Sequence, residues 1–191
     1  MKRIDTKTIS GLGIMAALVV VLQLLGSFVR FGPFSISLVN IPIVVGAILY
    51  GPYGGAFLGL VFGLTVLLSG DAALFLTVTV PGTVITVIVK GVAAGYVSGL
   101  VYELLKKNGT FAAVISAIVC PFVNTGMFLI GCLIFFMDTI SGWAAAAGLA
   151  GNVGTYMIVG LVGGNFLAEL LVSTVLSPVV LRLLKIVKNR A

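Results

Sequence analysis

Residues 84–97 read VITVIVKGVAAGYV, an apolar stretch with a single charge, Lys90, near its middle. A cation in the interior of a bilayer costs at least about 2.5 kcal/mol, so such a side chain faces protein, water or a ligand. The chain is 60% hydrophobic and 8% charged, whereas soluble domains carry about 25% charged residues. Uncharged runs at 31–70, 72–89, 108–137 and 139–168 are long enough to cross a bilayer. The sequence therefore predicts an all-α integral membrane protein.

The basic residues mark one side of that membrane. Nine of the eleven lie in three groups, which are Lys2, Arg3 and Lys7 at the N-terminus, Lys106 and Lys107 in one loop, and Arg182, Lys185, Lys188 and Arg190 at the C-terminus. The positive-inside rule assigns these groups, and with them both termini, to the cytoplasm. Termini on the same side require an even number of spans, and six fit. Because its charges are grouped in this way, the net charge of +6 does not indicate a nucleic-acid partner.

We therefore expect one domain, 1–191, with six transmembrane helices. Their approximate ranges are 8–25, 41–50, a third that follows the turn GPYGG and ends at Leu68, 81–106, 111–136, and 156 toward 182. The helix at 41–50 rises only about 18 Å against a core of about 30 Å, so protein must cover its end. A long extracellular loop, 26–40, is the expected cover, and its FSISL segment suits a short strand. Further outer loops hold Gly70 and Asp71, and residues 138–156.

Polar side chains lie at one depth on four of these helices. Gln23 is 16 residues from Lys7, Lys90 is 16 from Lys106, Asn124 is 17 from Lys107, and Asn165 is 17 from Arg182. At 1.5 Å per residue, each lies about 24–26 Å from its cytoplasmic anchor. Thr83 and Thr86 share a helix face with Lys90. The convergence predicts a pocket for a small polar molecule in the outer third of the membrane. The alternatives are a polar network that only ties the helices together and, for Lys90, a salt bridge to Glu169.

Two cations, Arg30 and Lys90, are expected on the outer side, which favours an anionic or carboxylate-bearing ligand. Arg30 would alternatively extend to lipid headgroups, and Asp71 and Asp138 in the outer loops oppose the charge argument. The predicted ligand-binding residues are Gln23, Arg30, Thr86, Lys90, Asn124 and Asn165. On a regular helix Tyr156 lies about 180° from Asn165, so both face one pocket only if the helix is distorted between them.

Several absences argue against an enzyme. The chain has no histidine, no phosphate-binding G-x-x-x-x-G-K-[ST] motif, and no acid–base or metal-ligand spacing among its carboxylates. We expect no catalytic residue, no cofactor and no metal. Cys120 and Cys132 are twelve residues apart on one predicted helix, too far for a disulfide, and are expected to pack as small apolar side chains.

Small residues recur at four-residue spacing along several helices. The stripes are Gly13 and Ala17; Gly55, Gly59 and Gly63; Gly91, Gly95 and Gly99; and Gly160 and Gly164. In lipid such stripes let helix backbones approach closely. They are expected to pack within the bundle, with one alternative. The stripe on the first helix would instead meet another membrane subunit.

The order of these parts resembles the substrate-binding S components of energy-coupling factor transporters. The similar segments are VNIPIVVGAILYGPYGGAFLGLVFG (39–63), PGTVITVIVKGVAAGYVSGLVYELLKK (81–107), VNTGMFLIGC (123–132) and NFLAELLVSTVLSP (165–178), so the resemblance covers nearly the whole chain. It implies a multi-pass protein of the bacterial cell membrane that binds a vitamin at its extracellular side. It also implies a transmembrane coupling protein (T component) and two cytoplasmic ATPases as partners, and release of the cargo by toppling. Gly13 and Ala17 match the family's coupling-protein contact, and Lys90, Asn124 and Asn165 lie where family sites lie.

The sequence leaves the vitamin itself open. The general resemblance is to riboflavin- and pantothenate-type members, and two outer cations favour pantothenate, whose carboxylate a lysine would neutralise. Pyridoxine-type compounds, riboflavin and lipoate are the alternatives. Two other functional classes compete with an S component. One is a self-sufficient secondary transporter with Lys90 and Glu169 as an ion-coupled pair, and the other is a structural membrane subunit.

Overall fold

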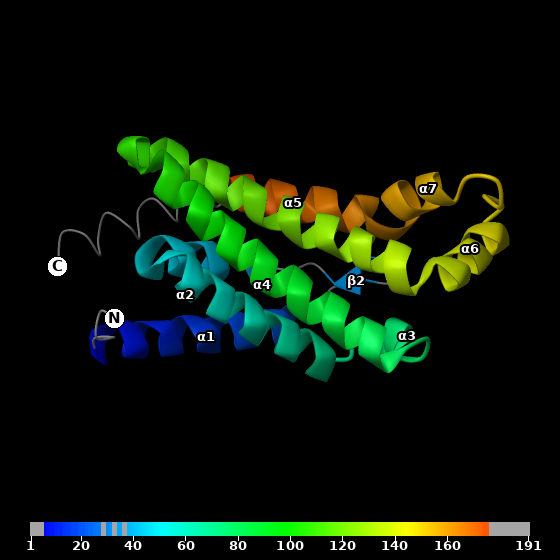
Figure 1. Cartoon of the computed structure of the whole chain (residues 1–191), viewed down its shortest axis with the longest axis horizontal. Helices are drawn as coiled ribbons and strands as arrows, with labels where there is room; N and C mark the ends of the chain where they lie inside the picture. The colour runs from blue at the N-terminus through cyan, green and yellow to red at the C-terminus, as the bar shows by residue number, and fades with distance from the viewer. Residues whose placement is uncertain (1–5, 28–29, 32–33, 36–37, 176–191) are drawn as a thin grey trace.

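Helices make up nearly all of the chain in the computed structural model, which describes residues 6–27, 30–31, 34–35 and 38–175, with side chains for 6–27 and 38–175. The elements in chain order are α1 (Thr6–Gly26), β1 (Arg30–Phe31), β2 (Phe34–Ser35), α2 (Asn40–Leu68), α3 (Ala73–Leu76), α4 (Val80–Leu105), η1 (Lys106–Asn108), α5 (Gly109–Phe135), α6 (Met137–Ala146), α7 (Val153–Thr155) and η2 (Tyr156–Gly163). The helix that α7 and η2 begin continues to Val175. Together they form an elongated bundle (Figure 1).

Four helical stretches are long and apolar enough to cross a membrane: Thr6–Gly26, Asn40–Leu68, Val80–Phe135 and Val153–Val175. Their outward faces are apolar as well. Ile14 and Leu25 on α1, Ile134 on α5 and Leu171 on the last helix each expose more than half of their surface. Exposed apolar side chains on every side suit lipid rather than water. The chain is an all-α integral membrane protein, as its composition predicts.

The longest of the single helices, α2, reverses direction at Gly51. Gly51 has φ +78°, a left-handed conformation that a glycine adopts without steric cost. Pro52 follows it, and proline suits the first turn of a new helical segment. The two arms then pack on each other, because a Cβ on Gly46 would meet Leu58 and one on Gly55 would meet Ala47. The predicted break at GPYGG is confirmed, and the arm 40–50 is a half-length helix.

The second arm of α2 packs against α4 backbone to backbone. A Cβ added to Gly59 would press on the carbonyl group of Gly91, and one on Gly55 would press on the carbonyl group of Gly95. The reverse additions, at Gly91 and Gly95, would clash in the same way. These two stripes therefore pack within the bundle, as predicted. The other stripes do not, since no described atom lies within 4 Å of a Cβ on Gly13 or Gly164.

Short helices close one end of the bundle, where the sequence predicted loops. In α3, Phe75 makes edge-on ring contacts with Phe128 (5.4 Å between centroids), Phe136 (5.0 Å) and Trp143 of α6 (5.7 Å). Such contacts between aromatic edges and faces are favourable. The outer segments predicted as loops, the one that holds Gly70 and Asp71 and the one at 138–156, are therefore helical in part, as α3 and α6. At 26–40, β1 and β2 pair as a short antiparallel hairpin, so a strand is present at Phe34–Ser35 of the predicted FSISL segment.

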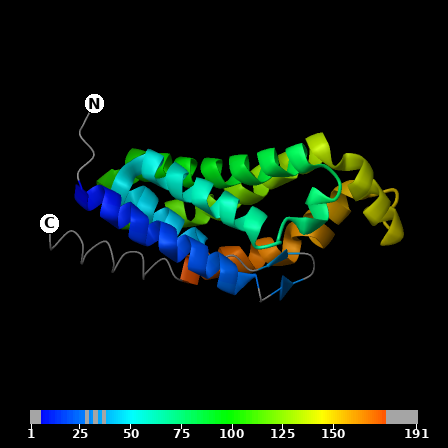
Figure 2. The ribbon, with the colours of Figure 1, turned by 90° about the horizontal axis from the view of Figure 1, so that it is seen from below.

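Charges divide between the two ends of the bundle. The first turn of α1, with Lys7, and η1, with Lys106 and Lys107, lie at one end, and α3 and α6 lie at the other (Figures 1 and 2). Asp138 is in the first turn of α6, where the helix dipole stabilises a carboxylate. We call the end with α3 and α6 the capped end.

Gly59→Ala should lower the thermal stability of the detergent-solubilised protein. The added methyl group presses on the Gly91 backbone, and overpacking of this kind costs about 1–3 kcal/mol. Gly126→Ala on α5 is the matched control, because no described atom lies within 4 Å of its Cβ and alanine is the better helix former. Thermal unfolding should give a lower Tm for Gly59→Ala and an equal or higher Tm for Gly126→Ala. Equal Tm values for the two variants would contradict the packing described for α2 and α4.

Candidate ligand-binding site

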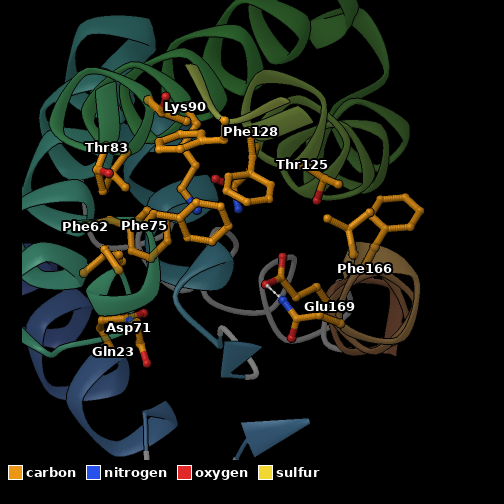
Figure 3. Close-up of a pocket in the computed structure, with 18 residues that line it drawn as sticks. Gln23, Phe62, Asp71, Phe75, Thr83, Lys90, Thr125, Phe128, Phe166 and Glu169 are labelled. Carbon is orange, nitrogen blue, oxygen red and sulfur yellow. Dashed lines mark hydrogen bonds between the residues drawn. The ribbon is translucent and has the colours of Figure 1, made fainter. Parts of the chain in front are cut away.

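A cavity opens between the helices in the half of the bundle nearer the capped end. Its space free of atoms, open mouth included, is about 760 Å³. Side chains from α1, α2, α3, α4, α5 and the last helix surround it (Figure 3). Its polar wall consists of Gln23, Asp71, Thr83, Thr86, Lys90, Asn124, Thr125, Asn165 and Glu169. Its aromatic wall consists of Phe62, Phe75, Phe128, Phe136 and Phe166.

Five of the six residues predicted to bind ligand line this cavity. They are Gln23, Thr86, Lys90, Asn124 and Asn165, and they come from four different helices. Equal depth along the helices brought four of them together in the prediction, and a helix face shared with Lys90 added Thr86. The sixth residue, Arg30, lies in β1, and its side chain is outside the described residues.

Lys90 points from α4 into the cavity between two aromatic rings (Figure 3). Its Nζ lies 5.6 Å from the ring centroid of Phe62 and 5.3 Å from that of Phe128. Aromatic faces attract cations at this distance. In the described part of the chain no ion pair joins Lys90 to Glu169, so the salt bridge that the sequence left open is not formed. The ammonium group is available to a ligand at the cavity wall.

Glu169 holds two amide side chains from different parts of the chain. Its Oε1 accepts a hydrogen bond from Asn165 Nδ2 (3.1 Å), and its Oε2 accepts one from Asn40 Nδ2 (3.2 Å). Asn40 Oδ1 in turn accepts a long bond from Cys120 Sγ (3.8 Å). Glu169 is only 3% exposed, and hydrogen bonds of this kind stabilise a buried carboxylate. The network ties the start of α2 to α5 and to the last helix.

A second network joins α1 to the capped end. Gln23, 2% exposed, donates from Nε2 to Asp71 Oδ2 at 2.5 Å, and Ser69 Oγ donates to the same oxygen at 3.3 Å. The amide N–H2 group of Gln23 therefore already has an acceptor within the protein. This bond favours the structural alternative for Gln23 over a direct role in ligand binding.

Three buried oxygens of the cavity wall have no hydrogen-bond partner among the described residues: Thr86 Oγ1, Asn124 Oδ1 and Asn165 Oδ1. Leaving a buried polar atom unpaired costs about 1–3 kcal/mol. Thr83, by contrast, donates to the backbone carbonyl of Thr79. The unpaired oxygens mark the part of the wall where a ligand would gain most from hydrogen bonding.

The last helix reaches the cavity through wide turns. Residues Tyr156–Gly163 form a π-helix, η2, a form that often marks functional sites. At its first residue, Tyr156 packs among the aromatic side chains of the capped end, and after it Asn165 and Glu169 line the cavity. Tyr156 is not among the residues that line the cavity, and the helix between it and Asn165 is widened rather than regular.

The aromatic wall was missed from the sequence, as was the part played by Asp71 and Glu169 in the cavity wall. A signal existed for two of these residues. Phe128 follows Asn124 by four residues, and Glu169 follows Asn165 by four, so each pair shares a helix face. Phe75 had no comparable signal, since α3 was not predicted.

The chain is similar to known proteins of one family. A family model described as "ECF transporter, substrate-specific component" matches residues 7–181. The chain is also similar to the pantothenic acid transporter PanT of Lactococcus lactis subsp. cremoris (strain MG1363), with 26% identity over 208 aligned positions that cover 100% of both chains. No solved structure matches the chain.

Proposed function

The chain belongs to the family of substrate-specific components of energy-coupling factor (ECF) transporters, and from this premise we propose that it captures a carboxylate-bearing vitamin, with pantothenate the first candidate. Members of this family are multi-pass transport proteins of the cell membrane rather than enzymes. The observation that carries the proposal is the position of Lys90 in the cavity wall, without an ion pair to Glu169 in the described structure. A buried ammonium group between two aromatic rings gains when an anion binds beside it.

Other features support pantothenate as the cargo. Pantothenate has a carboxylate at one end, and an amide and two hydroxyl groups along the rest of the molecule. The carboxylate suits Lys90, and the donors suit the unpaired oxygens of Asn124 and Asn165. The relative named as a pantothenic acid transporter aligns with this chain over its full length. Riboflavin, lipoate and pyridoxine-type vitamins become the cargo only if mass spectrometry identifies them in the purified protein.

We propose six membrane crossings in one domain, residues 1–191, with both termini in the cytoplasm. The reversals at Gly51 and at η1 divide two of the four apolar stretches, which yields six helical segments. The lysines of α1 and η1 lie at the end opposite the capped end, in agreement with the positive-inside rule. The cavity then opens in the extracellular half of the membrane.

The proposed partners are a transmembrane coupling protein and two cytoplasmic ATPases, with release of the vitamin when this chain topples in the membrane. The face of α1 that carries Gly13 and Ala17 is exposed, and no described atom lies near a Cβ on Gly13. Small residues on an open face let a partner helix approach closely. This face is therefore the proposed contact with the coupling protein.

The function is tested by identifying what the purified protein holds. Protein solubilised in detergent is denatured, and the released small molecules are identified by mass spectrometry. Binding of pantothenate to ligand-free protein is then measured by calorimetry. We expect about one pantothenate per chain and nanomolar affinity. If a different vitamin is found at the same stoichiometry, it takes the place of pantothenate as the proposed cargo. If no molecule is bound and no vitamin binds, the capture function is refuted.

Lys90→Met should weaken pantothenate binding at least about tenfold, because a charge-assisted hydrogen bond contributes about 1.5–3 kcal/mol and tenfold corresponds to about 1.4 kcal/mol. Lys107→Met is the control, since Lys107 lies in exposed η1 outside the cavity. Both variants should elute as monodisperse protein. Unchanged affinity in Lys90→Met would assign the carboxylate to another residue.

Replacing both Gly13 and Ala17 with leucine should prevent copurification with the coupling protein while pantothenate binding stays unchanged. The leucines keep the partner backbone away from α1. Gly142→Leu on α6 serves as the control, because no described atom lies within 4 Å of its Cβ. Copurification is measured by coexpression with an affinity-tagged coupling protein. Full retention of the double variant would show that the contact lies elsewhere.

A further inference from the structure

The orientation of one cavity-lining amide follows from its partner. Asn165 Nδ2 donates to Glu169 Oε1 at 3.1 Å, a bond drawn as a dashed line at Glu169 in Figure 3. A carboxylate accepts hydrogen bonds and cannot donate them, so the N–H2 group of Asn165 must face Glu169. Its carbonyl oxygen, Oδ1, is then turned away from Glu169, and this atom has no partner among the described residues.

Asn40 fixes Glu169 from the other side. Its Nδ2 donates to Oε2 of Glu169 at 3.2 Å, so each carboxylate oxygen has its own amide donor. Because Asn40 begins α2 and Asn165 lies on the last helix, the carboxylate is held between two separate elements. Rotation of either amide would place a carbonyl oxygen against the carboxylate, which is unfavourable. Glu169 therefore determines how Asn165 presents its amide.

Two more oxygens of the same character lie on the facing helices. Asn124 of α5 and Thr86 of α4 are each 5% exposed and line the cavity. Asn124 Oδ1 and Thr86 Oγ1 also lack a partner in the described part of the protein. The cavity wall thus offers more hydrogen-bond acceptors than the described residues supply with donors.

We propose that Asn165, Asn124 and Thr86 form a subsite for hydrogen-bond donors, in which Glu169 is a positioning residue that holds the Asn165 carbonyl oxygen toward the ligand. The ligand places hydroxyl or amide N–H groups in this subsite and its anionic group at Lys90. This inference rests on the proposed function and narrows it to ligands that combine a carboxylate with several donors. Lipoate, whose polar group is a single carboxylate, would leave the subsite unpaired. Sites that hydrogen-bond a substrate hydroxyl strongly reject analogues without it.

The test compares pantothenate with its difluoro analogue, in which fluorine replaces both hydroxyl groups and cannot donate. The quantity measured is the ratio of the analogue's Kd to that of pantothenate. We expect a ratio of at least about 10 for the unmodified protein, one hydrogen bond being worth about that factor. Glu169→Leu should reduce it below about 3, because Asn165 is no longer held in one orientation. A general loss of protein stability would weaken the binding of both ligands and leave the ratio of their Kd values unchanged.

The double variant Glu169→Gln/Asn40→Asp should restore the ratio. The carboxylate introduced at position 40 accepts the N–H2 group of the glutamine introduced at position 169. The glutamine carbonyl then accepts from Asn165 as Glu169 does. Glu103→Leu, at an exposed position outside the cavity, is the control. If Glu169→Leu does not fold, Asn124→Ala provides the second test, because it removes one acceptor and leaves the Glu169 network intact.

The outcomes separate this inference from the proposed function. Pantothenate binding with a ratio near 1, or a ratio that Glu169→Leu and Asn124→Ala both leave unchanged, would overturn the donor subsite while the vitamin function stands. If pantothenate does not bind, the cargo assignment fails, and the molecule released from the purified protein decides the subsite. A released ligand with several hydroxyl or N–H donors supports it. A ligand without such donors, or no ligand at all, overturns it.

Discussion

The close approach of α2 and α4 is the constraint on which the rest of the structure depends. Gly55 and Gly59 meet Gly95 and Gly91 with no side chain between the backbones. This contact places Phe62, one turn beyond Gly59, beside Lys90, which immediately precedes Gly91. A bulkier residue at the contact would separate the two helices and move the phenylalanine ring away from the ammonium group. The geometry of the cavity is thus set by residues that do not line it.

Bilayer burial explains why the cavity wall is organised into networks. Lipid offers no hydrogen bonds, so polar groups within the span must find partners inside the protein. Gln23 and Asp71 satisfy each other near the capped end, and Glu169 is satisfied by Asn40 and Asn165. Lys90 lines the cavity, and three buried oxygens of cavity-lining residues have no hydrogen-bond partner in the described structure. The described wall contains two carboxylates and one ammonium group, so net charge alone does not select an anionic cargo. The position of the Lys90 ammonium group within the wall is what favours an anionic cargo.

Regular features of the helix made part of this structure predictable. The rise per residue is constant, so distances from basic residues on the predicted cytoplasmic side placed Gln23, Lys90, Asn124 and Asn165 at one depth. Gly51 followed by Pro52 marks a chain reversal, because glycine adopts the left-handed conformation and proline then starts a new segment. Helices α3 and α6 escaped prediction because they are short and their stability comes from contacts such as Phe75 with Trp143. The bond between Asn40 and Glu169 spans 129 positions, which no local pattern reveals.

The wide turns of η2 have a consequence for how this chain tolerates insertions and deletions. Tyr156 packs in the capped end, and Asn165 and Glu169 line the cavity, so the segment between them sets the rotational phase of the last helix. Loss of one residue there, with the turns staying wide, would rotate the remainder of that helix relative to Tyr156 by the angle of one residue. Asn165 and Glu169 would leave the cavity together, with the backbone hydrogen bonding largely preserved. In this segment, the number of residues matters for the cavity as much as the identity of the side chains does elsewhere.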